Sequence, residues 1–324
     1  MMTRLQIANE LKNNNKYIIL THENPDGDTI GSALSLAESL KLSGREAFVF
    51  GLRPIPKSFD FLSGFDEIMN TEETEVRCYI GEGYTPIFVD FAHFERSGLD
   101  SFPDGAKIIA IDHHQVKIDP NHYAVIEPET ASASELVYQI LKLAKLPITA
   151  SIGNAVMTGI LTDSGSFHYP NVTKETFEIA YELVELGVDI SYVSEMIYER
   201  ASIANRRLLG IALSRMKVSE NGKFVTTRIE HTDIEKTGAN RTDLDFIIDE
   251  VRKLSGMEVY ILGKEYKPGE FRISLRGRGK ISLNKFAKKF GGGGHINAAG
   301  LTLHGTWEEI EQTLIDGLTK ELQI

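Results

Sequence analysis

The sequence predicts an α/β protein of two domains: an N-terminal doubly wound, mostly parallel sheet, followed by a smaller C-terminal α/β domain. Short apolar runs alternate with amphipathic helical stretches through the first half of the chain. This pattern changes near Asp189, where a long helical stretch begins. The length of 324 residues also suits two domains better than one.

The strands of the first domain are predicted from five short apolar runs. The first four are rich in Ile, Val or Phe, which is typical of parallel strands buried on both faces. The predicted strands are Tyr17–Thr21, Ala47–Gly51, Pro86–Asp90, Lys107–Asp112 and Tyr123–Ile126.

Amphipathic helices are predicted between these strands. Within Thr29–Lys41, the apolar residues recur at helical spacing and fall on one face. The next long helix shows the same pattern at Leu136, Val137, Ile140, Leu141 and Ala144. A doubly wound sheet follows from this alternation, and such sheets usually bind ligands beyond the carboxyl ends of their strands.

The second half of the chain reads as a linker and a smaller domain. We predict an N-terminal domain over residues 1–190, a helical linker over 191–214 and a C-terminal domain over 215–324. The C-terminal domain begins with a β-hairpin whose turn is Asn221-Gly222. Its other predicted elements are strands at Glu258–Gly263 and Glu270–Arg276 and helices at Asp243–Ser255 and Trp307–Leu322.

The overall composition limits the classes of function. The formal net charge is 35 − 46 = −11, which argues against binding of long duplex DNA. Cys78 is the only cysteine, so no internal disulfide and no cysteine-built metal site are expected. The first 16 residues are polar, and no apolar run is long enough to span a bilayer. We therefore expect a cytoplasmic protein without a membrane anchor.

Acidic residues and histidines follow several of the predicted strands. His22, Asp26 and Asp28 follow the first strand, Asp90 ends the third, and Asp112-His113-His114 follows the fourth. Asp163 comes after an apolar helix at Ile152–Leu161. Because parallel strands end at one edge of a sheet, we expect these side chains to converge in one crevice.

This constellation is suited to two divalent cations. Four carboxylates at close range would repel one another, and two cations would supply four compensating positive charges. Oxygen-rich ligands with some imidazole favour Mn²⁺ or Mg²⁺ over structural zinc. Taken singly, each piece has an ordinary alternative: Asn-Pro-Asp-Gly is rich in turn formers, and a lone Asp at a strand end is often a helix cap.

A glycine-rich segment near the end of the chain is a second signal. Four successive glycines, Gly291–Gly294, precede His295 and would let the backbone approach an anion closely. Upstream, Arg276 and Arg278 supply guanidinium groups that suit phosphate. The alternative is a flexible linker, but the flanking sequence is apolar and linkers normally have polar surroundings.

The motifs together resemble those of the DHH phosphoesterases, a superfamily that includes the exonuclease RecJ, family II pyrophosphatases and nano-RNases. The matching segments are His22-Glu-Asn-Pro-Asp-Gly-Asp28, Asp90, Asp112-His113-His114 and Leu161-Thr-Asp163. The resemblance implies two metal ions, usually Mn²⁺. One would be held by His22, Asp26 and Asp90. The other would be held by Asp28, Asp90, His113 and Asp163, with Asp90 bridging the two.

The same resemblance implies roles for the remaining site residues. His114 would face the substrate phosphate as an acid or electrostatic stabiliser, and Asp112 would orient the histidines. The C-terminal segment resembles the DHH-associated domain of the nano-RNase branch. There, Arg276 and His295 would grip the terminal phosphate, and Gly293 and Gly294 would contribute backbone N–H groups. The implied active-site cleft lies between the two domains, which would close on the substrate.

One position departs from the family pattern. Phe91 follows Asp90, where relatives commonly have a small or hydroxyl residue, so it could alter the wall of the pocket. For His93 and Arg96, a substrate contact and an ordinary surface role remain equally open.

The function implied is hydrolysis of very short single-stranded oligoribonucleotides to mononucleotides and of 3′-phosphoadenosine 5′-phosphate to AMP. Three alternatives remain: a soluble phosphodiesterase acting on cyclic or linear di-adenylate, a polyphosphatase or pyrophosphatase, and a nucleotide sensor without catalysis. The sensor is disfavoured because no metal-ligand position is missing from the sequence. The oligomeric state is left open, with a homodimer as one alternative.

Overall fold

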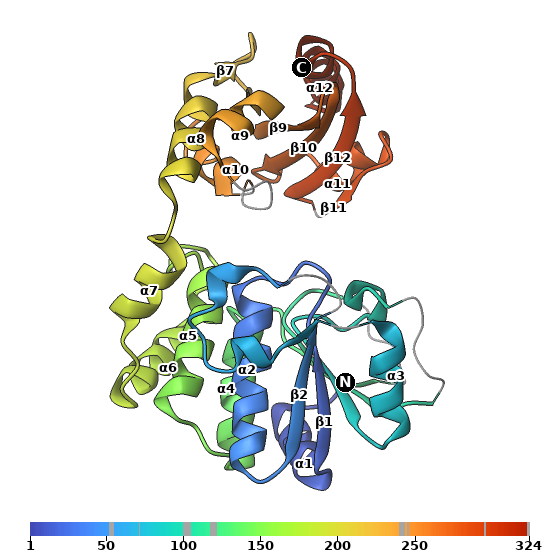
Figure 1. The fold of residues 1–324 in the computed structure, drawn as a ribbon, viewed down its shortest axis with the longest axis vertical. Coiled ribbons are helices and arrows are strands. Elements are labelled where there is room, and N and C mark those ends of the chain that lie inside the picture. The colour runs from blue at the N-terminus through green and yellow to red at the C-terminus, as the bar shows by residue number, and fades with distance from the viewer. Residues whose placement is uncertain are drawn as a thin grey trace. The chain divides into compact units, whose positions relative to one another are not determined.

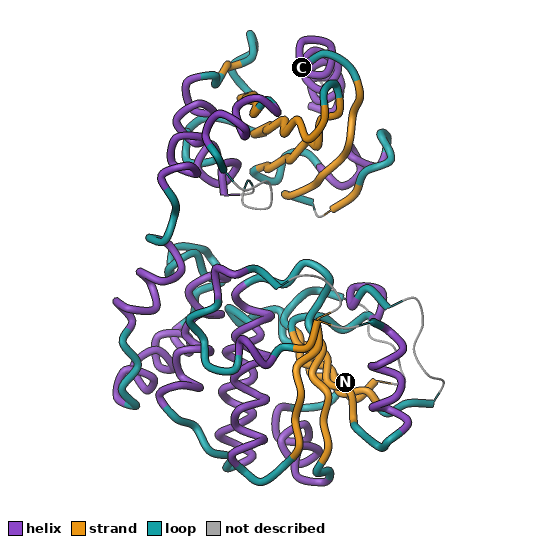
Figure 2. Tube along the Cα trace, viewed as in Figure 1, coloured by secondary structure: helices purple, strands orange, loops and turns teal. Residues whose placement is uncertain are grey.

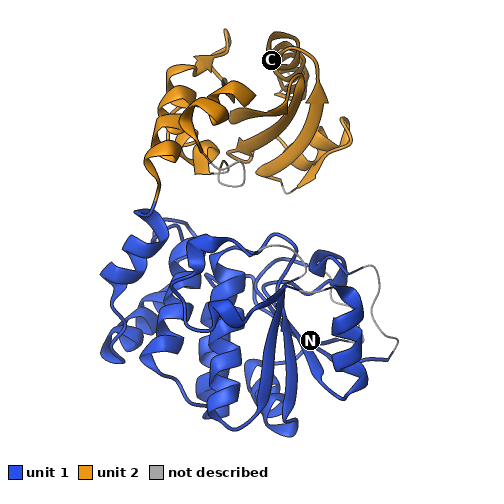
Figure 3. Ribbon diagram, in the orientation of Figure 1, with its two compact units in different colours: residues 1–200 blue, residues 201–324 orange. Residues whose placement is uncertain are grey.

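The structure is a computed structural model, and it describes residues 1–51, 55–70, 72–99, 105–116, 122–239, 244, 246–294 and 296–322. The chain divides into two compact units, Met1–Arg200 and Ala201–Ile324, which are coloured separately in Figure 3. Each unit is described by itself below.

A six-stranded parallel sheet forms the centre of the first unit, which confirms the predicted fold class. Its strands lie in the order β3-β2-β1-β4-β5-β6, and every neighbouring pair is parallel. Figure 1 labels β1 and β2 of this sheet. Five of the strands match the predicted runs to within a residue or two at each end, and the short edge strand β3 was not predicted. The strands are β1 Lys16–Leu20, β2 Glu46–Gly51, β3 Met69–Asn70, β4 Thr85–Val89, β5 Ile108–Asp112 and β6 His122–Ile126.

Helices cover both faces of this sheet, as a doubly wound fold requires. Alternate strand residues, such as Ile19 and Ile18, pack into two different apolar clusters on opposite faces. Helices α1 (Arg4–Asn13), α2 (Gly27–Leu42) and α4 (Ala133–Ala144) pack on one face, and α3 (Glu73–Gly81) packs on the other. Figure 2 shows the helices on either side of the strands.

A further group of helices packs outside α2 and α4. Helix α5 (Ala150–Asp163) lies against α2, α4 and the next two helices, α6 (Lys174–Glu185) and α7 (Ile190–Tyr198). Three short 3₁₀ turns, η1 (Lys57–Phe59), η2 (Phe65–Glu67) and η3 (Phe94–Ser97), complete the described elements of this unit.

Glycines allow α2 and α5 to approach backbone to backbone. A Cβ atom built on Gly31 would lie 2.3 Å from the carbonyl oxygen of Ala155, a distance that real Cβ atoms do not reach. A Cβ atom on Gly159 would lie 1.9 Å from Oγ of Ser134, in the first turn of α4. The absence of side chains at these positions therefore sets the close packing of the three helices.

The strand order places a topological switch point between β1 and β4. From β1 the chain proceeds to β2 on one side, whereas β4 lies on its other side and leads on to β5 and β6. Ligands of open α/β sheets bind beyond the carboxyl ends of the strands at such a point. The segments after β1 and β4 begin at Thr21 and Asp90, close to the predicted site residues.

The second unit contains a mixed six-stranded sheet in the order β11-β12-β10-β9-β8-β7. Strands β8 and β9 are parallel, and the other neighbouring pairs are antiparallel. The predicted hairpin is confirmed as β7 and β8, with Gly222 at a positive φ of 65° in its turn. The strands are β7 Lys217–Val218, β8 Phe224–Ile229, β9 Val259–Lys267, β10 Glu270–Gly277, β11 Gly293–Gly294 and β12 Ala298–His304.

Two groups of helices pack against this second sheet. Helices α8 (Ile203–Ser214), α9 (His231–Thr237) and α10 (Phe246–Val251) share one apolar cluster with β8 and β9. Helices α11 (Leu283–Lys288) and α12 (Trp307–Leu322) share the other with β9, β10 and β12. The helix at Trp307–Leu322 has the predicted bounds. The predicted helix at Asp243–Ser255 is shorter, and residues 243 and 245 lie outside the described residues.

The helical stretch predicted at 191–214 consists of two helices. Helix α7 ends at Tyr198 and packs against α5 in the first unit, whereas α8 begins at Ile203 and packs into the second. The hydroxyl of Ser202 accepts a hydrogen bond from the backbone N–H of Asn205 and so caps the start of α8. In the described ranges, we find no helix with the length and apolar character needed to cross a bilayer.

Candidate metal centre and substrate-binding residues

The predicted site residues of the first unit lie at the ends of five elements, β1, β4, β5, α2 and α5. His22 lies two residues beyond the last residue of β1, Asp90 directly follows β4, and Asp112 is the last residue of β5. Asp26 is the N-cap of α2, and its carboxylate accepts hydrogen bonds from the backbone N–H groups of Asp28 and Thr29, both at 3.1 Å. The cap fixes the turn that carries both acidic residues of this segment.

These side chains converge into three overlapping groups whose potential ligand atoms lie within 4.8 Å of one another. Asp90 belongs to two of the groups and His113 to two. The groups are His22, Asp26 and Asp90; Asp28, His113 and Asp163; and Asp90, His113 and His114.

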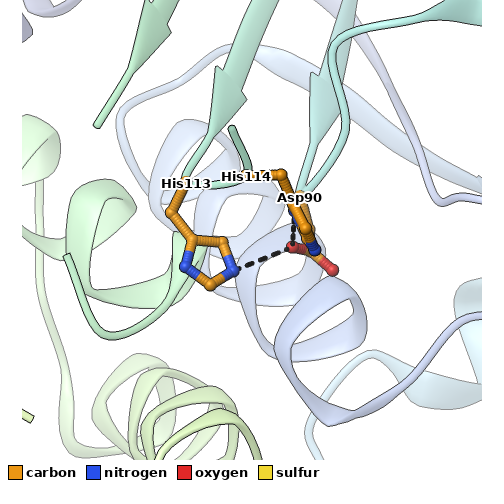
Figure 4. A group of neighbouring side chains, drawn as sticks. All are labelled: Asp90, His113 and His114. Atoms are coloured by element: carbon orange, nitrogen blue, oxygen red, sulfur yellow. Dashed lines mark ion pairs between the residues drawn. The ribbon is translucent and has the colours of Figure 1, made fainter. Parts of the chain in front are cut away.

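Asp90 occupies the centre of this cluster. Its Oδ2 atom lies 3.2 Å from Nε2 of His22. Its Oδ1 atom lies 3.5 Å from Nε2 of His113 and 3.5 Å from Nδ1 of His114, as Figure 4 shows. Its backbone has a positive φ of 66°, a conformation that is uncommon outside glycine but tolerated by Asp and Asn. The chain turns at this residue so that its carboxylate lies between the three histidines.

Unsatisfied buried atoms test whether the site suits metal ions. Oδ1 of Asp90 and Nε2 of His113 are buried and have no hydrogen-bond partner in the described part of the chain. Buried polar atoms normally have a partner, so two such atoms side by side are unusual. The backbone carbonyl of Thr130 accepts a hydrogen bond from Nδ1 of His113 at 3.2 Å, which leaves Nε2 as the nitrogen available to a metal. The donor set therefore fits a divalent cation.

Asp28 is held by the N-terminus of helix α4. Its two carboxylate oxygens accept hydrogen bonds from the backbone N–H groups of Ala133 at 2.6 Å and Ser134 at 2.8 Å. Both groups belong to the first turn of α4, where unpaired N–H groups and the helix dipole favour a negative charge. Asp28 is 0% exposed, so this charge is kept in the interior by the helix end and its neighbours.

The pKa values of the cluster indicate an excess of negative charge. Burial, with the nearby carboxylate of Asp90, raises the pKa of Asp28 well above its usual value. Burial lowers the pKa of His113, but the nearby carboxylates of Asp163 and Asp90 outweigh this effect and raise that pKa to about 12. A divalent cation would compensate this excess of negative charge.

Asp163 joins the cluster from the end of the apolar helix that the sequence predicted before it. It is the last residue of α5, and its Oδ2 atom lies 3.1 Å from Nε2 of His113. Asn171 donates a hydrogen bond to its backbone carbonyl at 3.1 Å. An acidic side chain at the C-terminus of a helix is unfavourable with respect to the helix dipole, which a bound cation would offset.

His114 has a different environment from His113. The carboxylate of Asp112 accepts a hydrogen bond from the backbone N–H of His114 at 3.0 Å and another from Nδ1 of the His114 ring at 2.8 Å. Asp112 is wholly buried, whereas the side chain of His114 is 34% exposed. Asp112 thus fixes the ring through Nδ1 and leaves Nε2 without a partner among the described residues.

Thr29 is a site residue that the sequence analysis missed. Its hydroxyl lies 2.6 Å from Oδ2 of Asp90 and can donate to it, and its backbone N–H donates to Oδ1 of Asp26. Thr29 is wholly buried in the first turn of α2. It therefore orients two of the candidate ligands without being a ligand itself.

We expect Thr29→Val to weaken Mn²⁺ binding about 10- to 100-fold, because it keeps the shape of the side chain but removes the donor to Asp90. Isothermal titration with Mn²⁺ measures this effect directly. Thr29→Ser retains the hydroxyl and should restore most of the affinity. Thr226→Val, a buried threonine of the second unit, is the matched control. Equal affinities for Thr29→Val and Thr226→Val would contradict the assignment.

Phe91 does not line an open pocket wall, contrary to the expectation from the sequence. It is 0% exposed and stacks on Phe88, with ring centroids 4.7 Å apart. Its ring also lies edge-on to that of His22 at 6.4 Å. Phe91 therefore belongs to the core, where its ring packs against that of His22. His93 and Arg96 are both partly exposed, in or next to η3.

The predicted substrate residues lie at two places in the second unit. Arg276 is in β10, where its Nε atom lies 3.5 Å from Oδ1 of Asp249. Gly293 and Gly294 form β11, which pairs with β12. Gly294 has a φ of 139°, and a Cβ atom there would lie 2.4 Å from the carbonyl oxygen of Ala298, so only glycine fits. His295 lies outside the described residues.

Overlapping groups of carboxylates and histidines at the switch point of a parallel sheet define a metal-dependent phosphoesterase. Comparison with known proteins agrees with this class. Residues 16–160 match the N-terminal domain of the DHH family, and residues 221–322 match the DHHA1 domain. The chain belongs to the DHH family.

Individual relatives cover nearly the whole chain. A bifunctional oligoribonuclease and PAP phosphatase, NrnA of Thermus thermophilus, is 32% identical over 94% of this chain and 89% of its own. An exopolyphosphatase-related protein from Bacteroides fragilis has a similar structure, with a TM-score of 0.89 at 25% identity over 98% of this chain and 96% of its own. The exonuclease RecJ bound to manganese shares the fold at a TM-score of 0.53 and 15% identity, over 98% of this chain and 93% of its own.

Proposed function

We propose that this chain hydrolyses very short oligoribonucleotides to mononucleotides and 3′-phosphoadenosine 5′-phosphate to AMP. The observation that carries the proposal is the set of three overlapping ligand groups linked through Asp90 and His113, together with a buried Asp90 oxygen that has no partner among the described residues. The similarity to a bifunctional oligoribonuclease and PAP phosphatase along nearly the whole chain supports this choice of substrates.

Two Mn²⁺ ions are the proposed cofactors, with Mg²⁺ as the alternative. His22, Asp26 and Asp90 would hold one, and Asp28, Asp90, His113 and Asp163 would hold the other. A pair of divalent cations supplies Lewis acidity and an acidic bound water next to the phosphoryl group. Oxygen ligands with histidine suit Mn²⁺ and Mg²⁺.

The side chains of His114 and Asp112 would assist the hydrolysis of the phosphate ester. With Nδ1 bonded to Asp112, the ring of His114 presents Nε2 to a substrate oxygen. From Nε2 the ring can donate a hydrogen bond to a phosphoryl oxygen as negative charge develops there. We assign His114 the role of electrostatic stabiliser or acid, and Asp112 that of orienting it.

The C-terminal residues would bind the substrate. We propose residues 1–190 as the phosphoesterase domain, 191–214 as the linker and 215–324 as the substrate-binding domain. Arg276, with a guanidinium group suited to phosphate, and the backbone of Gly293 and Gly294 are the proposed contacts, together with His295.

A substrate panel with Mn²⁺ tests the proposal. It comprises labelled RNA of two to six nucleotides, 3′-phosphoadenosine 5′-phosphate, linear di-adenylate, pyrophosphate and polyphosphate. We expect mononucleotides from the shortest RNAs and AMP from the bisphosphate, with both activities lost in EDTA and restored by Mn²⁺. Hydrolysis of pyrophosphate or polyphosphate alone would refute the substrate assignment. Mn²⁺ binding without hydrolysis of any member would favour a nucleotide sensor.

A further inference from the structure

The second unit has a polar patch on one face of its sheet. In β10, Phe271, Ile273 and Leu275 are buried against the cluster that contains α11 and α12. Side chains alternate along a strand, so Arg272 and Ser274 lie on the opposite face. The neighbouring strands place Thr302 and Lys264 beside Arg272, and Gly300 beside Ser274.

This patch forms a pocket of about 400 Å³ within the second unit. Pockets of this size are in the range that accommodates small organic ligands, about 300–1,000 Å³. Among the described residues, its lining holds two cationic side chains, two hydroxyls and no carboxylate, in addition to glycines and three apolar residues. The lining residues are Lys264, Arg272, Ile273, Ser274, Phe290, Gly291, Gly292, Gly300, Leu301 and Thr302.

The guanidinium group of Arg272 is oriented and exposed in a way that allows it to bind an anion in this pocket. Its guanidinium carbon lies 4.8 Å from the centroid of the Tyr266 ring, a cation–π contact that orients the group. The residue is exposed, and among the described residues no carboxylate pairs with it. A guanidinium held over an aromatic ring still presents its N–H groups to phosphate oxygens.

Gly300 keeps the floor of the pocket open. A Cβ atom built on it would meet its nearest neighbour, the carbonyl oxygen of Ile273, at 3.6 Å, which is ordinary van der Waals contact. Its backbone is not in the left-handed region, so a larger residue can be accommodated without strain. Because Gly300 lies on the same face as Thr302, a side chain there would extend into the pocket.

We propose that this pocket binds a second phosphate-bearing nucleotide of the substrate, through Arg272, and thereby sets how binding depends on oligonucleotide length. The inference rests on the proposed function, since it assigns a further nucleotide to the same substrate. Arg272 and Arg276 lie four residues apart on one strand face, a separation of about 13 Å along the strand. They would therefore contact different phosphates of one short chain.

The test compares Arg272→Gln and Gly300→Val with the unaltered chain. With Mn²⁺ present, KM and kcat are measured for an RNA dinucleotide and a tetranucleotide. The first variant removes the charge and the second fills the pocket. We expect each to raise the ratio of the tetranucleotide KM to the dinucleotide KM about tenfold, with little change in kcat. Arg207→Gln, an exposed arginine of α8, is the matched control.

An unchanged ratio of KM values in both variants would overturn the inference. The inference would also be overturned if the variants raised KM equally for the dinucleotide and the tetranucleotide and if added AMP competed with both substrates. The pocket would then bind a separate nucleotide and not a further nucleotide of the substrate. If the unaltered chain hydrolyses no RNA, the proposed function fails. The inference is then decided by anisotropy of a fluorescein-labelled tetranucleotide in EDTA. Arg272→Gln should weaken that binding about tenfold, and unchanged binding would refute the pocket assignment.

Discussion

Replacing Asp90 with Asn should lower the rate of phosphate-ester hydrolysis about 1,000-fold or more. Asp90 belongs to two of the three candidate ligand groups and contributes a buried oxygen that lacks a partner among the described residues. Loss of its charge removes the shared ligand, and several kcal/mol of transition-state stabilisation correspond to about three powers of ten in rate. Asn is preferred to Ala as the replacement because Asn also tolerates the positive φ of this residue.

Two measurements distinguish a lost ligand from a damaged fold. Thermal unfolding without metal should give similar midpoints for Asp90→Asn and the unaltered chain, whereas the rise in midpoint on adding Mn²⁺ should be much smaller in the variant. Asp66→Asn, which changes an exposed carboxylate in η2 of the same unit, is the control. A variant with near-normal turnover and a normal response to Mn²⁺ would end the assignment of Asp90 as a shared ligand.

Replacing Gly159 with Ala should disrupt the metal centre from outside the ligand set. The added methyl group would lie 1.9 Å from Oγ of Ser134 and 2.5 Å from Oδ1 of Asp28. Asp28 cannot move without losing its hydrogen bonds to the N-terminus of α4. We expect overpacking to destabilise the unit by about 1–3 kcal/mol and Mn²⁺ affinity to fall about 10- to 100-fold.

Gly153→Ala provides a matched comparison in the same helix. Its added methyl group would lie 2.5 Å from Cγ2 of Val188 and would contact no candidate ligand. Both variants should unfold at lower temperature, but only Gly159→Ala should lose Mn²⁺ affinity in isothermal titration. As a second control, Gly210→Ala, with no atom within 4 Å, should change neither property adversely. Equal Mn²⁺ affinities for Gly153→Ala and Gly159→Ala would show that Gly159 has no special role.

Much of the fold could be predicted from the sequence because buried parallel strands leave a strong signal. Apolar runs located β1, β2, β4, β5 and β6, and helical periodicity located α2 and α4. Strand β3 was missed because two residues, Met69 and Asn70, carry no periodicity. Helix α9 is short and largely polar, so its pattern is equally weak. The break between α7 and α8 was signalled only by a serine cap at Ser202.

The candidate site could be predicted where residues able to bind a metal ion come directly after predicted strands. Acidic and histidine residues after strands could be expected to converge, and the structure places His22, Asp90 and His113 together. Thr29 could not be singled out, because a threonine in a helix gives no sign that its hydroxyl reaches a carboxylate 61 residues away. Gly159 was likewise hidden, since its role depends on the approach of helices that are distant in sequence.

The side chains of the candidate metal centre differ in exposure, and from this difference we expect an order of binding. Asp28 and Asp90 are 0% and 2% exposed, whereas Asp26 is exposed and the side chains of Asp163 and His114 are partly so. A substrate in contact with His114 would lie over the shallower members and separate the deeper carboxylates from bulk water. Cations would then have to enter before the substrate and leave after the product. Binding would be ordered, and metal added late to a substrate-saturated protein would act slowly.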